Sequence, residues 1–121
     1  MEKKTVLELI EEAKKDVDAV TAESLNESIS KNNTPIILDV REKEELDSGK
    51  IKNSLHIPRG MLEFLIETKV PDKEREIVVY CAKGPRSALA GKTLKLLGYK
   101  NVSFLAGGFD EWCKRNLEVE K

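Results

Sequence analysis

The chain has 121 residues, of which 40% are hydrophobic and 36% charged, with 21 lysines and arginines against 22 aspartates and glutamates. This length is typical of one domain with a real hydrophobic core and excludes two full domains. The near-neutral charge balance argues against intrinsic disorder and against a surface built to bind nucleic acid.

An amphipathic helix is predicted at the N-terminus, over residues 5–17. Glu11 and Lys15 form an oppositely charged pair on its outer side. Its apolar residues at helical spacing are Val6, Ile10, Ala13 and Val17. Charged residues interrupt this apolar pattern, which excludes the core of a signal peptide and a membrane-spanning helix. We therefore expect a cytoplasmic protein with no membrane partner.

Residues 1–17 are interpreted as a helical extension of the domain proper, residues 18–121. The apolar face of this extension needs a partner surface, because burial of that face supplies most of the stability of an amphipathic helix. Two arrangements satisfy the requirement. The helix docks on its own domain, or it pairs with a second copy in a homodimer.

Helical and strand-like segments alternate over the rest of the chain. Thr21 is a predicted N-cap of a short helix that ends near Ile29, and the polar segment 41–49 contains helix formers followed by a glycine. The predicted strands are the apolar runs 36–40, 55–57, 77–80 and 102–105. A helix over 85–97 and a closing helix through Trp112 complete the pattern. This alternation predicts an α/β fold whose parallel sheet is covered on both faces.

The two cysteines, Cys81 and Cys113, are expected to be free thiols. They lie far apart in a chain that shows no secretory signal and that can build its own core. The single histidine, His56, and the lack of closely spaced cysteines do not match the spacing of structural zinc sites. The sequence therefore predicts no metal site and no cofactor.

The segment from Cys81 to Ser87 joins a predicted buried strand to a predicted helix. In open α/β sheets, ligands bind at the carboxyl ends of strands, and Cys81 is the first residue past such an end. The N–H groups and dipole of the following helix stabilise an anion there, and the cationic side chains of Lys83 and Arg86 also favour a thiolate. These features favour a nucleophilic cysteine over the alternative, a small buried hydrophobic residue.

The residues between Cys81 and the helix are expected to form a cradle for a negatively charged sulfur. Gly84 permits the backbone angles of a tight loop, and Pro85 suits the first helical turn, where its missing N–H costs nothing. Backbone amides of such a loop converge on an anion. The amides available for this are those of Ala82, Lys83, Gly84, Arg86 and Ser87.

This loop resembles the active loop of the rhodanese-like domain family, which has the form Cys-x-x-Gly-x-Arg-Ser. The resemblance covers residues 18–117 and includes four further motifs. These are Asp39-Val40-Arg41-Glu42, Gly49-Lys50-Ile51, Ile57-Pro58, and Gly107-Gly108-Phe109 through Trp112. Lys50 stands where the family usually has a histidine, in a turn outside the active loop.

The resemblance implies a doubly wound, five-stranded parallel sheet with helices on both faces. It also implies a sulfurtransferase mechanism, in which Cys81 takes a sulfane sulfur from a donor such as thiosulfate and holds it as a persulfide. The sulfur then passes to a thiophilic acceptor, which is cyanide, a thiol or a protein. The persulfide is the only covalent intermediate, and the protein is expected to be a monomer or a homodimer.

Three charged residues are candidates for the rim of the site. Asp39 and Arg41 end a predicted central strand, and they either reach the rim or form a structural ion pair. Arg59 either supplies positive charge to an anionic donor or is a solvated loop residue.

Two other residues receive non-catalytic interpretations. His56 is expected to be packed or hydrogen-bonded. Cys113 is predicted to pack beside Trp112, and the alternative is a resolving thiol for an oxidised Cys81.

Two other functions fit parts of the pattern. A cysteine and an arginine on a loop at a helix N-terminus also serve phosphatases of this fold, but four residues separate Cys81 from Arg86, whereas the phosphatase pattern has five. A non-catalytic binding or regulatory module is the second alternative. The retained Cys81 and its complete loop argue against that reading.

Overall fold

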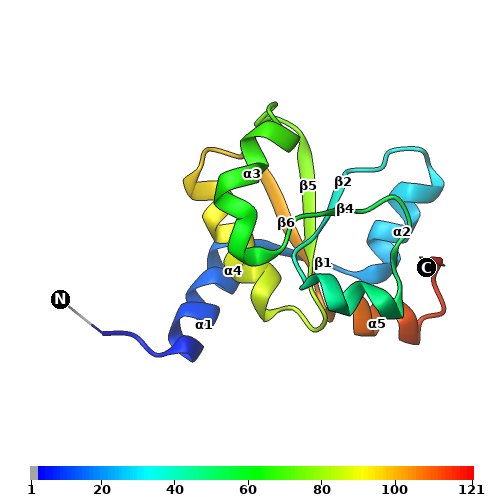
Figure 1. Ribbon diagram of the computed structural model, residues 1–121, viewed down its shortest axis with the longest axis horizontal. Coiled ribbons are helices and arrows are strands. Elements are labelled where there is room, and N and C mark those ends of the chain that lie inside the picture. Colours follow the sequence, from blue (N-terminus) through cyan, green and yellow to red (C-terminus); the bar gives the residue numbers. More distant parts are fainter. Residues whose placement is uncertain (1–2) are drawn as a thin grey trace.

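Five parallel strands form one sheet at the centre of the computed structural model, which describes residues 3–121 (Figure 1). In spatial order they are β1 (Asp18–Val20), β6 (Asn101–Leu105), β5 (Glu76–Tyr80), β2 (Ile36–Asp39) and β4 (Leu55–His56). All four neighbouring pairs run parallel. The order places later strands on both sides of β2, so the predicted doubly wound sheet is confirmed.

Helices cover both faces of this sheet (Figure 1). One face carries α1 (Val6–Asp16), α3 (Leu62–Lys69) and α4 (Pro85–Leu96), and the other carries α2 (Ala22–Ser30) and α5 (Gly108–Lys114). Side chains alternate between the faces along each strand, so Val79 packs against the first group and Val78 against the second. Both faces are therefore buried, which explains why the strands are continuous apolar runs.

Several elements lie outside the predicted pattern. β1 has only three residues and no apolar run, and its pairing with β6 makes it a strand. Residues 62–69 form α3, whose buried Leu62 and Ile66 are one helical turn apart. The predicted helical stretch 41–49 is the 3₁₀ helix η1 (Lys43–Ser48), and η2 (Arg59–Met61) is a second short 3₁₀ turn. A separate antiparallel pair joins β3 (Lys50–Ile51) to β7 (Val119–Glu120), two strands that are far apart in the sequence.

The N-terminal helix α1 docks on its own domain through its C-terminal half. Ala13 and Val17 are fully buried in the same core cluster as α4. The contact with α4 is close: a Cβ added to Gly91 would lie 2.9 Å from Val17 Cγ1. The other half of the predicted apolar face is only partly covered, because Ile10 is half-buried and Val6 is 68% exposed.

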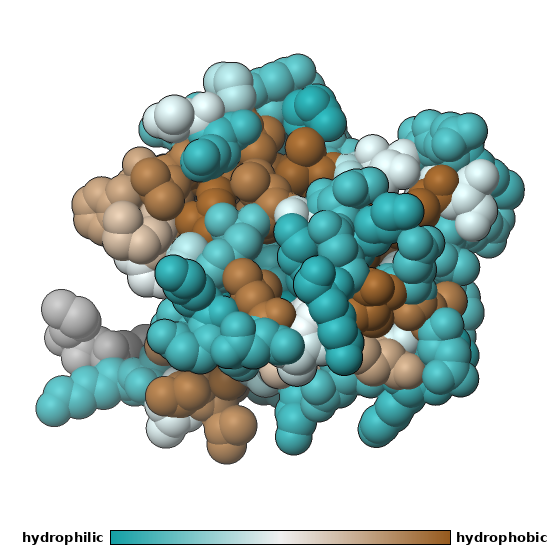
Figure 2. Space-filling model, turned by 45° about the vertical axis from the view of Figure 1, so that its right-hand side comes forward, coloured by the Kyte–Doolittle hydropathy of each residue, from teal (hydrophilic) through white to brown (hydrophobic). Residues whose placement is uncertain are grey.

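The face in Figure 2 carries many hydrophilic side chains and also apolar patches, the broadest at the upper left. In the described part of the chain, the exposed large apolar side chains belong to α1, η2, α3 and α4: they are Val6, Leu7, Leu9, Met61, Phe64 and Leu96. Among residues 3–121, no helix combines the length and apolar composition that a bilayer span requires.

Candidate functional site

Cys81 lies directly after β5, the central strand, at the carboxyl edge of the sheet. The residue is only 1% exposed, and its side chain points to the face that α4 covers. The strand order thus brings the loops after β2, β4, β5 and β6 to the same edge. This is the position that the sequence pattern predicts for a reactive group.

The loop after Cys81 turns one backbone donor onto the sulfur. The Gly84 amide donates to Cys81 Sγ at 3.1 Å, and Gly84 adopts a φ of +128° that other residues rarely accept. The Cys81 thiol donates to Ser87 Oγ at 3.7 Å, and the Ser87 hydroxyl donates to the Gly84 carbonyl at 2.7 Å. Gly84 and Ser87 therefore fix each other and the sulfur between them.

One of the five amides expected to be available to an anion in this loop bonds directly to the Cys81 sulfur within residues 3–121. Within the part of the chain that the structure describes, Gly84 supplies the only loop amide that hydrogen-bonds to Cys81 Sγ. The amides of Arg86 and Ser87 already belong to the first turn of α4, which begins at Pro85 as predicted. Those of Ala82 and Lys83 precede the sharp turn at Gly84 and also make no bond to the sulfur in residues 3–121.

A second loop, at the start of α5, holds the Cys81 peptide from the other side. The Phe109 amide donates to the Cys81 carbonyl at 2.8 Å, and the Asp110 amide donates to the Ala82 carbonyl at 3.0 Å. Gly108 permits this approach, because its φ is +59° and an added Cβ would lie 2.5 Å from the Cys81 carbonyl oxygen. The Gly107-Gly108 pair in the sequence predicts a turn before α5, but it does not predict that this turn contacts the Cys81 peptide.

Glu45, from η1, is a site residue that the sequence pattern did not identify. Its carboxylate accepts two hydrogen bonds from the Arg86 guanidinium, at 2.8 and 2.9 Å, and one from the Glu42 amide at 2.7 Å. The hydrogen bonds from Arg86 lower the pKa of Glu45 to about 2. Arg86 is therefore an ion-paired member of the loop and not a free cation.

Asp39 and Arg41 form a buried ion pair beneath this region, so the geometry favours the structural interpretation of the two residues. They are 0% and 2% exposed, and their closest contact joins Arg41 Nη2 to Asp39 Oδ2 at 2.8 Å. Arg41 also donates to the Gly49 carbonyl at 2.9 Å and lies 4.4 Å from the centre of the Phe109 ring. The pair ties the ends of η1 to the sheet and to α5.

Arg59 points toward α3 and α4. Its guanidinium donates to Glu63 Oε1 at 3.0 Å and to Thr93 Oγ1 at 3.0 Å. His56 is hydrogen-bonded as expected, with its Nε2 2.7 Å from the Arg41 carbonyl oxygen.

The predicted packing role of Cys113 is wrong, because this cysteine is exposed on α5. Trp112, its neighbour, faces the core instead and is 1% exposed. One residue along a helix turns the side chain by about 100°, which separates a core position from a solvent position.

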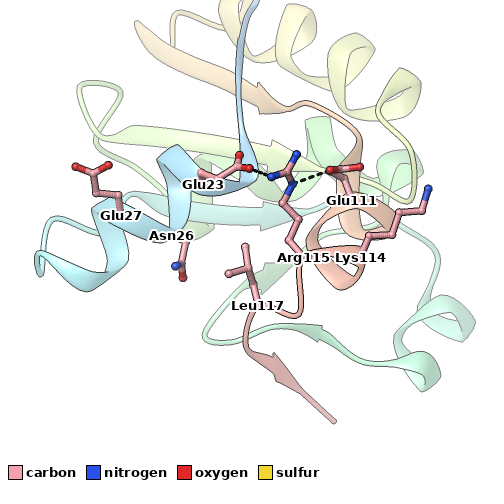
Figure 3. Close-up of a pocket in the computed structure, with 7 residues that line it drawn as sticks. All are labelled: Glu23, Asn26, Glu27, Glu111, Lys114, Arg115 and Leu117. Atoms are coloured by element: carbon pink, nitrogen blue, oxygen red, sulfur yellow. Dashed lines mark hydrogen bonds and ion pairs between the residues drawn. The ribbon is translucent and has the colours of Figure 1, made fainter.

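An open pocket of about 590 Å³ lies between α2 and the C-terminal part of the chain, and its lining contains no residue of the Cys81 loop (Figure 3). In this pocket Arg115 reaches Glu111 at 2.7 Å and also pairs with Glu23 (Figure 3). These ion pairs join α2 to the end of α5. Over residues 3–121, no group of three or more His, Cys, Asp or Glu side chains is arranged to hold a metal ion.

Comparison with known proteins gives one consistent family. The family model of the rhodanese-like domain matches residues 21–115. A sulfurtransferase from Allochromatium vinosum is 29% identical over 103 residues, which cover 85% of this chain and 94% of that protein. Some other matching relatives are longer proteins, and the chain spans 23% and 64% of two of them.

Solved structures agree with this match. A protein of unknown function from Rhodopseudomonas palustris, a possible tyrosine phosphatase, has a TM-score of 0.86 at 31% identity, over 99% of this chain and 97% of that one. The polysulfide-sulfur transferase homodimer of Wolinella succinogenes has a TM-score of 0.79 at 33% identity, over 92% of this chain and 83% of that one.

Proposed function

The chain belongs to the rhodanese-like domain family, and we propose that it transfers sulfane sulfur through a persulfide on Cys81. The sulfurtransferase relatives support transfer of sulfur groups in general. Thiosulfate is the proposed test donor, and cyanide or a thiol is the proposed acceptor.

In the proposed reaction, the Cys81 thiolate attacks the outer sulfur of thiosulfate. The new Cys81 S–S bond forms while the S–S bond of thiosulfate breaks, and its electron pair leaves with sulfite. The persulfide then gives its outer sulfur to cyanide, which forms thiocyanate and returns the thiolate. The two steps need no metal or organic cofactor, because the electron pairs stay with the sulfur atoms.

The hydrogen bond from the Gly84 amide to Cys81 Sγ at 3.1 Å is the observation that carries this proposal. A fixed backbone donor aimed at the sulfur stabilises negative charge on it without reorganisation during the reaction. Ser87 Oγ also contacts the sulfur, at 3.7 Å, and the exposed Lys83 adds positive charge along the loop. Together these groups form the proposed anion-binding loop.

The decisive experiment is the intact mass of the protein after incubation with thiosulfate and removal of the excess. We expect a gain of one sulfur atom, released by a thiol reductant and absent in Cys81→Ser. A gain that persists in Cys81→Ser and disappears in Cys113→Ser would show that Cys113, and not Cys81, holds the transferred sulfur. If the mass of the wild-type protein increases with neither thiosulfate nor an organic thiosulfonate, the proposal is refuted.

Phosphatase activity is the second candidate, favoured by the possible tyrosine phosphatase among the similar structures. Two features argue against it. Only four residues separate Cys81 from Arg86, and the guanidinium that would bind a phosphate ester is already paired with Glu45. Hydrolysis of p-nitrophenyl phosphate that depends on Cys81 would favour the phosphatase instead.

The partners of the proposed reaction are a small sulfur donor and either a small or a protein acceptor. A putative sulfur carrier protein of Bacillus subtilis is among the relatives, which makes a protein acceptor a reasonable expectation. We propose a monomer or, as in the Wolinella succinogenes transferase, a homodimer. Two free thiols suit a reducing compartment such as the cytoplasm.

A further inference from the structure

The positive charge around the Cys81 loop is largely neutralised. Of the four cationic residues considered from the sequence, three are paired: Arg41 with Asp39, Arg59 with Glu63 and Arg86 with Glu45. Lys83 is exposed and makes no ion pair within residues 3–121. A sulfur donor that approaches Cys81 therefore meets one uncompensated cation on this loop, Lys83, and not two.

The carboxylate of Glu45 is placed to control the charge of Arg86 in particular. Both terminal nitrogens of Arg86 are engaged, Nη1 by Oε2 and Nη2 by Oε1 of Glu45. Such a bidentate pair fixes the guanidinium plane as well as its charge. Glu45 is itself fixed by the Glu42 amide at 2.7 Å, so the carboxylate cannot turn away without losing that bond.

Arg86 also interacts electrostatically with the reactive sulfur. Its pKa is raised chiefly by the hydrogen bonds that it donates to Glu45, with smaller contributions from the negative charges of Cys81 and Glu42. The other acidic group near the loop is Asp110, whose amide binds the Ala82 carbonyl. The loop thus carries two cations, the exposed Lys83 and the Arg86 that Glu45 of η1 pairs.

We infer that Glu45 is a specificity-determining residue, which disfavours dianionic sulfur donors such as thiosulfate relative to monoanionic ones. The inference rests on the proposed function, because it concerns the donor that Cys81 attacks. A thiolate that approaches a dianion is repelled about twice as strongly as one that approaches a monoanion. Free cations would offset this repulsion, and Glu45 removes one of them.

A matched pair of donors isolates the effect of charge. Thiosulfate is a dianion, and methanethiosulfonate is a monoanion in which a methyl group replaces one charged oxygen. In both, the Cys81 thiolate attacks the outer sulfur and its S–S bond breaks. The electron pair leaves with sulfite in the first case and with methanesulfinate in the second, so charge is conserved in each step.

The experiment measures kcat/KM for both donors, with cyanide as the acceptor and thiocyanate as the product. The discrimination ratio is the kcat/KM for methanethiosulfonate divided by that for thiosulfate. We expect Glu45→Gln to lower this ratio about tenfold, the effect of one unit charge near a partly exposed site. The difference from wild type should shrink between about 0.01 M and about 1 M salt, because salt screens the charge of Arg86.

Glu44→Gln is the control. Glu44 is exposed and belongs to the same helix η1, and its substitution removes the same charge as Glu45→Gln. Its ratio should match that of wild type within about twofold, the residual field of one distant charge in water. An equal loss with both donors in Glu45→Gln would make Glu45 a structural residue and overturn the inference, as would an equal change in Glu44→Gln. Wild-type protein that transfers sulfur from neither donor would instead refute the proposed function itself, and the inference with it.

Discussion

The amide of Phe109 donates to the carbonyl of Cys81 at 2.8 Å, so the first turn of α5 holds the peptide of the proposed nucleophile. This bond joins two loops that are separated along the chain by α4 and β6. It requires the backbone of Gly108 to pass within contact distance of that carbonyl. The site is therefore sensitive to changes on α5 as well as on its own loop.

Gly108→Ala is expected to destabilise the protein and to displace the Cys81 loop. The added methyl group would lie 2.5 Å from the Cys81 carbonyl oxygen, and the φ of +59° is unfavourable for alanine. We expect a loss of about 1–3 kcal/mol in the free energy of unfolding and a reduced rate of sulfur transfer. Urea unfolding and the thiocyanate assay measure the two effects. Gly60→Ala is the control, since a Cβ at Gly60 meets nothing within 4 Å and should change neither quantity.

Cys81→Ser is expected to lower sulfur transfer from thiosulfate to cyanide by roughly a thousandfold or more, because a hydroxyl cannot carry the sulfur. Its melting temperature should remain near that of wild type, since the serine hydroxyl fits the space of the thiol. Cys113→Ser should keep a near-normal rate, because Cys113 is exposed on α5. A comparable loss in Cys113→Ser would show that this thiol takes part in the reaction.

The pairing of Glu45 with Arg86 predicts a pH dependence of stability. The pKa of Glu45 is lowered to about 2 from 4.5, so its contribution is present above pH 4.5 and is lost as the pH falls toward 2. The stability difference between wild type and Glu45→Gln should therefore be constant near neutral pH and shrink between pH 4.5 and 2. Because the Glu45 side chain is one third exposed, we expect the difference in the free energy of unfolding to be less than about 1 kcal/mol. Urea unfolding at several pH values measures this difference, and Glu44→Gln controls for the loss of one negative charge. A difference that grows as the pH falls would contradict the ion pair.

The two ends of α1 should respond differently to the same substitution. Val17→Ala removes two methyl groups from the core beside Gly91, and we expect it to cost about 1–3 kcal/mol. Val6→Ala should cost less than about 0.5 kcal/mol, because Val6 is 68% exposed. Thermal unfolding of the two variants tests this at one protein concentration. An equal cost at both positions would show that the exposed half of α1 is covered in solution, as in a homodimer.

The local parts of the site could be predicted from the sequence. A β-branched strand that ends in cysteine, followed by glycine, proline and arginine, specifies its own turn and helix start, and Cys81, Gly84 and Pro85 lie where this pattern places them. The partners across the sheet edge could not be predicted in this way. The contacts of Glu45 with Arg86 and of Gly108 with Cys81 depend on strand order, which no local pattern encodes.

The missed elements have a similar cause. β1 has three residues and only gains its identity from pairing with β6, and α3 has a short apolar repeat of Leu62 and Ile66. Cys113 lies about 100° around α5 from Trp112, so the helix directs Trp112 to the core and Cys113 to solvent, a difference that the sequence pattern alone does not resolve.

The segment η1 contributes no buried residue to the core, although it contributes Glu45 to the site. Its sequence is therefore under little constraint from packing, whereas Cys81 is attached to the central strand and enclosed by both helical layers. Residues 42–48 therefore suit laboratory evolution. A library of variants confined to these residues would vary the charge near Cys81, while the sheet and the Cys81 loop keep their sequence. If Cys81 transfers sulfur as proposed, such a library would change the choice of donor without changing the residues that perform the transfer.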